Sequence, residues 1–154
     1  MKKGFTIIEL LVVILVISIS IVGSYTVVGR IFAVTSVISL RLPAVYLAQE
    51  GIEIVRNIRD SNWVNSDNWD DGLPFGDFEA DYTDLFLSDS YFGNKLKINN
   101  NIYTYSGGTD SIYDRKITLS SNGSGSLNVS VTVNWISNGS NHNISVEENI
   151  YDWK

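Results

Sequence analysis

The sequence predicts an α+β fold, in which a long N-terminal helix packs in its second half on a C-terminal antiparallel β-sheet. Three observations support this prediction. An apolar run with a single charge occupies residues 5–28. Helical periodicity resumes over residues 44–61. Segments that alternate apolar and polar residues, separated by Asn, Ser and Gly, then fill residues 95–153.

The apolar run is long enough to span a membrane. Residues 5–28 would form a helix of about 36 Å, and the hydrocarbon core of a bilayer measures about 30 Å. Lys2 and Lys3 precede the run, and positive flanking charge tends to stay in the cytoplasm. We therefore expect a single pass through the inner (cytoplasmic) membrane with the N-terminus in the cytoplasm.

Glu9 separates the possible interpretations of this run. A secretory signal peptide would have a shorter apolar core and a small-residue cleavage site after it, and neither is present. A plain membrane anchor fits the length. It gives no role to Glu9, however, because a carboxylate in the bilayer costs roughly 2.5 kcal/mol or more and usually serves a function.

A third interpretation accounts for Glu9. The segment KKGFTIIELLVV, from Lys2 to Val13, has a short basic leader, a Gly, an aromatic residue, and Glu as the fifth residue of an apolar helix. It resembles the processing site of type IV prepilins and type II secretion pseudopilins. The resemblance implies that a prepilin peptidase and methyltransferase cuts between Gly4 and Phe5 and methylates the new amine of Phe5.

The same resemblance implies that Glu9 pairs with the Phe5 ammonium of a neighbouring subunit when the helices enter a filament. Physical chemistry is consistent with this role. Two isolated charges among apolar helices are costly, whereas a close pair offsets part of the desolvation. Such a pair would also fix the register between otherwise smooth apolar helices.

The resemblance, closest to minor pilins, also implies the pilin fold and a division of the chain. The expected parts are a leader (1–4), a transmembrane and filament-core helix (5–28), its continuation (29–61) and a globular head (62–154), which comprises an acidic connector (62–90) and the antiparallel sheet (95–153).

Pro43 lies inside the helical pattern of the continuation. A proline removes a backbone donor, so we expect a kink or a break there. After it, Ala44, Ala48, Ile52 and Val55 recur at helical spacing. They predict a face that packs on the sheet.

The connector is acidic and rich in aromatic residues, which we expect to cover the core between helix and sheet. Asp67, Asp70 and Asp71 are weak candidates for a Ca²⁺ site, because this cation prefers several oxygen ligands. Their spacing does not match the EF-hand loop. A solvated acidic loop is the alternative.

The sheet region predicts five strands and two tight turns. Leu127, Val129, Val131, Val133 and Trp135 alternate with polar residues, which is typical of a half-buried strand. The expected strands are 95–98, 102–105, 113–119, 127–135 and 143–153, with turns at 99–101 and 138–139.

Composition argues against several functional classes. Residues 1–59 have a net charge of +3 and residues 60–154 of −9, so nucleic acid is not the predicted partner. Without Cys there is no disulfide or thiolate site. The single His142 is expected in an exposed turn, and Glu147 and Glu148 point to opposite faces of a strand. No catalytic set and no cofactor are predicted.

The sequence therefore favours a structural subunit of a type IV pilus-like or pseudopilus filament over an enzyme. The implied partners are the prepilin peptidase, other pilin subunits through the N-terminal helix, and the inner membrane before assembly into a cell-surface or extracellular filament. One alternative is a filament-borne adhesive module with the acidic aromatic connector as its binding patch. Another is a membrane-anchored enzyme head of unrecognised chemistry.

Overall fold

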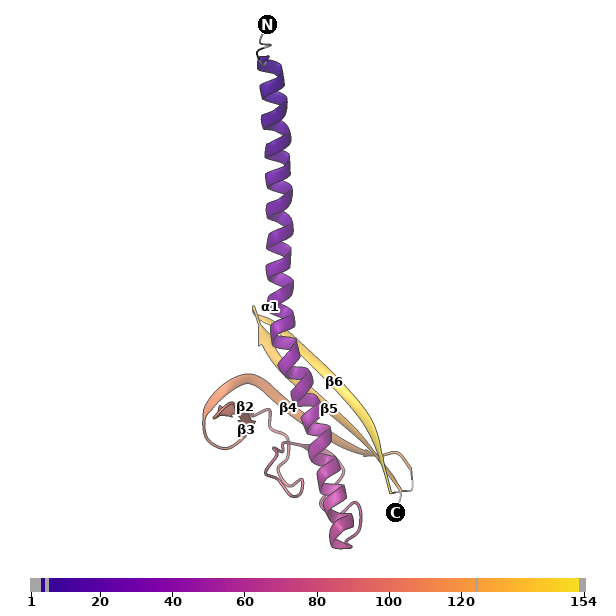
Figure 1. Cartoon of the computed structure of the whole chain (residues 1–154). Coiled ribbons are helices and arrows are strands. Elements are labelled where there is room, and N and C mark those ends of the chain that lie inside the picture. Colours follow the sequence, from indigo (N-terminus) through magenta and orange to yellow (C-terminus); the bar gives the residue numbers. More distant parts are fainter. Residues whose placement is uncertain (1–3, 5, 124, 153–154) are drawn as a thin grey trace. The chain divides into compact units, whose positions relative to one another are not determined.

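A computed structural model describes the chain at residue 4 and over residues 6–123 and 125–152, apart from the side chains of residues 33, 34, 36 and 37. It has the predicted α+β architecture, a long helix followed by a six-stranded antiparallel sheet (Figure 1). The elements are α1 (Ile7–Asn65), β1 (Gly76–Phe78), β2 (Lys95–Asn99), β3 (Ile102–Thr104), β4 (Thr109–Ser121), β5 (Ser126–Ser137) and β6 (Ser140–Tyr151).

The chain divides into two compact units, Met1–Leu40 and Arg41–Lys154. In the first unit, the described apolar side chains of α1 are exposed, except for the half-buried Leu40. Ile7–Phe32 is long and apolar enough to cross a membrane, with a mean hydropathy of 2.7. Its serines hydrogen-bond within the helix. For example, the Ser18 hydroxyl donates to the Ile14 carbonyl oxygen at 2.7 Å. Such bonds satisfy polar groups that lipid cannot.

In the second unit, α1 continues through Pro43, so of the two expected outcomes, a kink or a break, the break is absent. A proline inside a helix costs roughly 3 kcal/mol or more. Directly after it, Ala44, Leu47 and Ala48 are at most 2% exposed. Burial of this face holds the helix together across the lost hydrogen bond.

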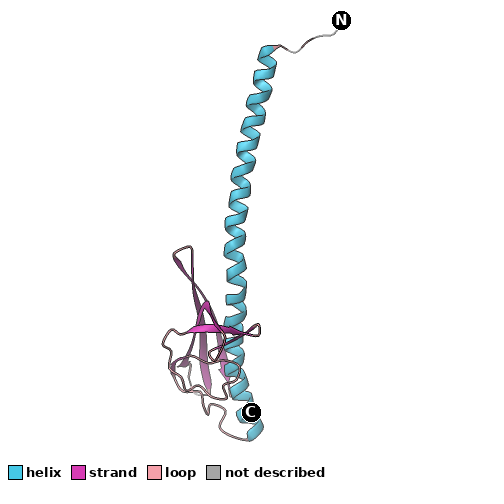
Figure 2. Cartoon of the chain, turned by 90° about the vertical axis from the view of Figure 1, so that its left-hand side faces the viewer, coloured by secondary structure: helices cyan, strands magenta, loops and turns pink. Residues whose placement is uncertain are grey.

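The strands of the second unit follow the order β3-β2-β4-β5-β6, and β1 pairs with β4 beside β2. All pairs are antiparallel. Both predicted turns are confirmed. Asn100 and Asn101 link β2 to β3, and Asn138 and Gly139 link β5 to β6, all four with positive φ. Figure 2 shows the strands on one side of the lower part of α1.

The core lies between the second half of α1 and the sheet. Val129, Val131 and Val133 of β5 are all 0% exposed. Gly51 of α1 lies so close to β5 that a Cβ at this position would come within 2.7 Å of Val131 Cγ1. Every buried apolar residue of the described chain belongs to Arg41–Lys154. We therefore expect this unit to fold without the first 40 residues.

The connector differs from its prediction. α1 extends to Asn65, and β1 lies within the connector. Phe78 is buried, but most other aromatic side chains here are exposed and do not cover the core: Phe75, Tyr82 and Phe86 are 57–64% exposed. The aliphatic residues Leu73, Ala80 and Leu87 fill the space instead. Two neighbouring carboxylates are also buried here, held by the hydrogen bonds described below.

Candidate functional sites

The first candidate site is the start of α1. Gly4 is exposed and not helical, and α1 begins at Ile7. Thr6 caps the helix, since its Oγ1 accepts a hydrogen bond from the Glu9 N–H at 3.3 Å and its carbonyl oxygen accepts one from Leu10. Phe5, the predicted site of cleavage and methylation, lies outside the described residues.

Glu9 lies in the first turn of α1 and is exposed. Within the described part of the chain, its carboxylate has no hydrogen-bond or ion-pair partner. It is also the one acidic residue of the apolar span Ile7–Phe32. A carboxylate in this setting is costly to bury without a partner.

Comparison with known families bears on this segment. Residues 1–25 match the family model of the prokaryotic N-terminal methylation motif. The chain carries the signature of type IV pilins and pseudopilins. No curated protein and no solved structure matches the chain significantly. The pilin signature thus rests on the segment that holds Gly4, Thr6 and Glu9.

Further along the chain, the three candidate ligands for Ca²⁺ are not arranged as a metal site in the described structure. Asp67, Asp70 and Asp71 are exposed in turns after α1, and the Asp67 N–H donates to the Asn62 carbonyl oxygen at 2.9 Å. Among the described residues, no group of three or more His, Asp or Glu side chains is arranged to hold a metal ion. The three aspartates shape the turns that follow the helix.

His142 does not lie in a turn, contrary to the prediction. It belongs to β6, and its ring stacks on that of Trp135 with 5.5 Å between the ring centroids. Its Cα pairs with that of Trp135 across the β5–β6 ladder. Packing against Trp135 thus accounts for the place of His142 in the strand.

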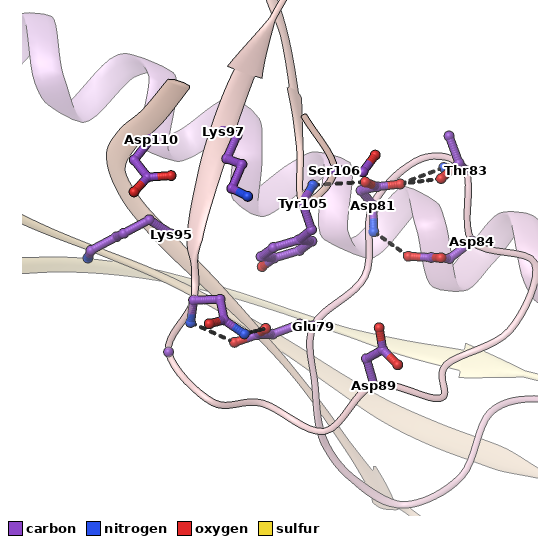
Figure 3. Close-up of a pocket in the computed structure, with 12 residues that line it drawn as sticks. Glu79, Asp81, Thr83, Asp84, Asp89, Lys95, Lys97, Tyr105, Ser106 and Asp110 are labelled. Atoms are coloured by element: carbon purple, nitrogen blue, oxygen red, sulfur yellow. Dashed lines mark hydrogen bonds between the residues drawn. The ribbon is translucent and has the colours of Figure 1, made fainter. Parts of the chain in front are cut away.

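The second candidate site is a hollow of about 650 Å³ in the unit Arg41–Lys154, between the connector and the β2–β4 region (Figure 3). Two buried carboxylates build its wall. Glu79 is 6% exposed and accepts hydrogen bonds from the Phe92 and Asn94 N–H groups, each at 2.9 Å, and from the Asn94 amide at 2.7 Å. This carboxylate therefore fastens the connector to the start of β2.

Asp81 is 4% exposed and fastens the connector to β3. Its Oδ2 accepts from the Thr104 hydroxyl at 2.6 Å and the Tyr105 N–H at 3.0 Å, and its Oδ1 accepts from the Thr83 hydroxyl and N–H. Burial by itself would raise the pKa of Asp81, but these donors outweigh it and lower the pKa to about 2. The Asp81 carboxylate is thus ionised, and both of its oxygens already accept hydrogen bonds from the protein.

The groups still available to a ligand lie elsewhere on the hollow. Lys97 and Asp110 line it from neighbouring strands, with paired Cα atoms. Asp89 lines it from the connector, as does Asp84, whose Oδ2 already accepts a hydrogen bond from the Asp81 N–H at 2.7 Å. Counting all its residues, the lining holds five carboxylates and two lysines. This balance suits a ligand with hydroxyl or ammonium groups and disfavours an anionic one.

Sequence reasoning missed Thr6, Glu79 and Asp81. The first had a readable signal, since Thr6-x-x-Glu9 has the spacing of a capping box. Asp81-x-Thr83 likewise has the spacing of a turn that an Asp side chain closes. Glu79 had no such signal, because its donors come from 13 and 15 residues further along the chain.

Proposed function

We propose that this protein is a structural subunit of a type IV pilus-like or pseudopilus filament, made as a membrane-inserted precursor and cleaved after Gly4. The observation that carries the proposal is the methylation motif at residues 1–25, joined to an apolar helix whose acidic residue has no partner within the described chain. The basic leader and the apolar span support insertion with the N-terminus in the cytoplasm.

The local structure suits cleavage between Gly4 and Phe5. A peptidase needs its substrate extended, and Gly4 precedes the cap at Thr6 that starts the helix. A Cβ at Gly4 would meet no atom within 4 Å. The fold itself therefore does not require Gly here, which supports a requirement imposed by the peptidase, because a side chain would hinder approach to the scissile bond.

Assembly would then rest on Glu9. In the proposed filament, the ammonium of Phe5 from one subunit approaches the Glu9 carboxylate of its neighbour. Removing one partner of a buried pair costs about 3–5 kcal/mol, since the other charge is left uncompensated. The pair would thus favour one register among apolar helices that could otherwise slide.

Co-expression with a prepilin peptidase tests this function. Mass spectrometry should find a chain shortened by the four residues Met1–Gly4 and beginning with N-methylated Phe5. A Gly4→Leu variant should remain uncut, because its side chain occupies the space beside the scissile bond. Gly29→Ala is the matched control, as it changes a glycine that also lies in open space and should be cut normally. An intact Met1 in the unaltered chain would refute the proposal.

A second candidate function is adhesion through the connector. The observation that favours it is the hollow beside the connector, with its ligand-accessible Lys97 and Asp110. The unit Arg41–Lys154 should then bind a surface glycan on an array of polysaccharides. Asp110→Ala should weaken binding by roughly tenfold, the effect of about 1.4 kcal/mol, without changing the unfolding temperature. Asp152→Ala, an exposed site outside the hollow, is the control. Absence of binding across the array would reject the adhesive function and would leave the filament proposal unaffected.

A further inference from the structure

β6 forms a long free edge of the sheet. It pairs with β5 over its whole length, from Ser126↔Tyr151 to Ser137↔Ser140, without a register shift. In the described chain, no strand pairs with its other side. Figure 1 shows β6, in yellow, beyond β5 at one edge of the sheet. Such an edge presents unpaired N–H and C=O groups to another strand.

The turn before β6 determines which groups are unpaired. The two-residue turn Asn138-Gly139 closes on the pair Ser137↔Ser140, so Ser140 directs its N–H and C=O toward β5. These directions alternate along an antiparallel strand. The N–H and C=O groups that point away from β5 therefore belong to Asn141, Asn143, Ser145, Glu147, Asn149 and Tyr151.

β6 has only some of the features that usually protect an edge strand. Natural edges carry charged residues, above all Lys, or Pro, are short, or contain a bulge. β6 has 12 residues, no Lys, no Pro and no register shift. Of its two charged residues, Glu148 binds Arg56 of α1 at 2.7 Å, and Glu147 is exposed. The backbone of this edge is therefore open to a further strand.

The inner face of the sheet is also incompletely covered at β6. Ile144 and Val146 face inward and are half-buried, whereas their neighbours on β5, Val133 and Val131, are 0% exposed. α1 thus covers β5 more fully than β6. A strand added beside β6, with apolar residues facing inward, would cover Ile144 and Val146.

A second copy of β6 does not suit this edge. Two β6 edges paired antiparallel would run the α1 segments of the two heads in opposite directions. Under the proposed filament function, on which this step rests, all subunits share one direction in one membrane. A parallel pair would set the inward Ile144 and Val146 of one copy beside outward polar residues of the other. The other edge strand, β3, has only three residues.

We propose that the free edge of β6 binds an extended strand of a different polypeptide. That strand has apolar residues at the positions beside Ile144 and Val146, and a Lys or Arg beside Glu147. The main-chain hydrogen bonds hold the strand, and the side chains on its two faces select it. The basic residue complements a head whose charge is strongly negative.

Amide hydrogen exchange at single-residue resolution tests this proposal. In the isolated unit Arg41–Lys154, the N–H groups of Asn141, Asn143, Ser145, Glu147 and Asn149 should exchange fast, and those of the alternate residues slowly. In the assembled protein recovered from cells, the first set should exchange at least roughly tenfold more slowly, with a second polypeptide present in the sample.

Ser145→Pro provides the matched variant. It removes an N–H that faces the free edge and leaves the main-chain hydrogen bonds to β5 in place, a position where edge strands tolerate proline. It also removes the Ser145 hydroxyl, which lies 2.6 Å from Thr132 Oγ1 of β5. Ser145→Ala keeps the N–H, loses the same hydroxyl and is the control. The proline variant should lose the second polypeptide, and the alanine variant should retain it. If the proline variant fails to fold, the exchange comparison on the unaltered chain decides.

Two results would overturn the proposal. One is fast exchange of the same amides in the assembled protein, and the other is protection in a sample that holds only this chain. The N-terminus of the same sample is read by mass spectrometry. If the chain is cut after Gly4 and assembled but its β6 amides exchange fast, only the proposed binding of a strand to β6 is refuted. If the chain is uncut and unassembled, the filament function is refuted.

Discussion

The Arg115 guanidinium donates a hydrogen bond from Nη1 to the main-chain oxygen of Leu47, at 3.1 Å, across the interface between β4 and α1. Arg115 is 0% exposed, and its Nη2 donates to the Ala80 carbonyl oxygen at 2.6 Å. Glu50 Oε1 lies 3.5 Å from Nη1. One side chain thus joins the sheet, the helix and the connector.

Arg115→Ala should destabilise the unit Arg41–Lys154 by about 3–5 kcal/mol, because it leaves a cavity and two buried carbonyl groups without their donor. Arg115→Met should cost less, since its side chain fills much of the volume. Urea unfolding measures both. Unchanged stability in the alanine variant would mean that the guanidinium does not join these elements.

Gly51→Ala should destabilise the same unit by about 1–3 kcal/mol. Alanine favours a helix, but its Cβ would lie 2.7 Å from Val131 Cγ1 and 3.2 Å from Arg115 Cδ, and overpacking outweighs the gain. In a Val131→Ala background the penalty should shrink, because the nearest methyl groups are gone. A double-mutant cycle by urea unfolding reports this coupling. Equal penalties in both backgrounds would contradict the close approach.

Asp81 should make the head acid-sensitive. Its folded pKa of about 2 lies below the ordinary value of 3.8, so its ionised form stabilises the fold above about pH 4. That stabilisation, about 2 kcal/mol, is lost as the pH falls from about 4 to 2. Asp81→Asn should be less stable at pH 7 and should depend less on pH in this window. If the free energy of unfolding depended on pH in the same way for both proteins between about pH 4 and 2, the lowered pKa of Asp81 would be contradicted.

Glu9→Ala should be cut normally but should enter filaments at least roughly tenfold less, because the Phe5 ammonium of the neighbour would be buried without a partner. Glu9→Gln should behave alike, as the charge is required. Ser20→Ala, in the same span, is the control. Immunoblots of sheared filaments and membranes measure the ratio. Equal incorporation of all four chains would remove the register argument.

The apolar–polar alternation of β5 and the Asn-rich turns predicted much of the sheet. Both patterns are formed by residues that are neighbours in the sequence, so they can be recognised without the fold. Trp135, expected inward, is 4% exposed. Tertiary contacts escaped prediction. The acceptors of Arg115 come from 68 and 35 residues away in sequence. Pro43 stays within α1, and the helix face directly after it is buried against the rest of the unit. His142 lies in a strand because β6 begins at Ser140, directly after the turn Asn138-Gly139, and not at Asn143 as expected.

The candidate site at the N-terminus was more predictable than the hollow. A motif of consecutive residues fixes Gly4 and Glu9 along the chain, so their spacing is readable directly. The hollow is built by carboxylates whose donors lie on other segments. Glu79 and Asp81 look like part of a solvated acidic stretch until Asn94 and Thr104 are brought beside them.

The most direct test of the filament proposal is the N-terminus of the chain in filaments sheared from cells that produce it. The proposal predicts that mass spectrometry finds this chain in the filament fraction, beginning with methylated Phe5. A chain that retains Met1 and stays in the membrane fraction, while other pilins in the same cells are cut and assembled, would contradict it.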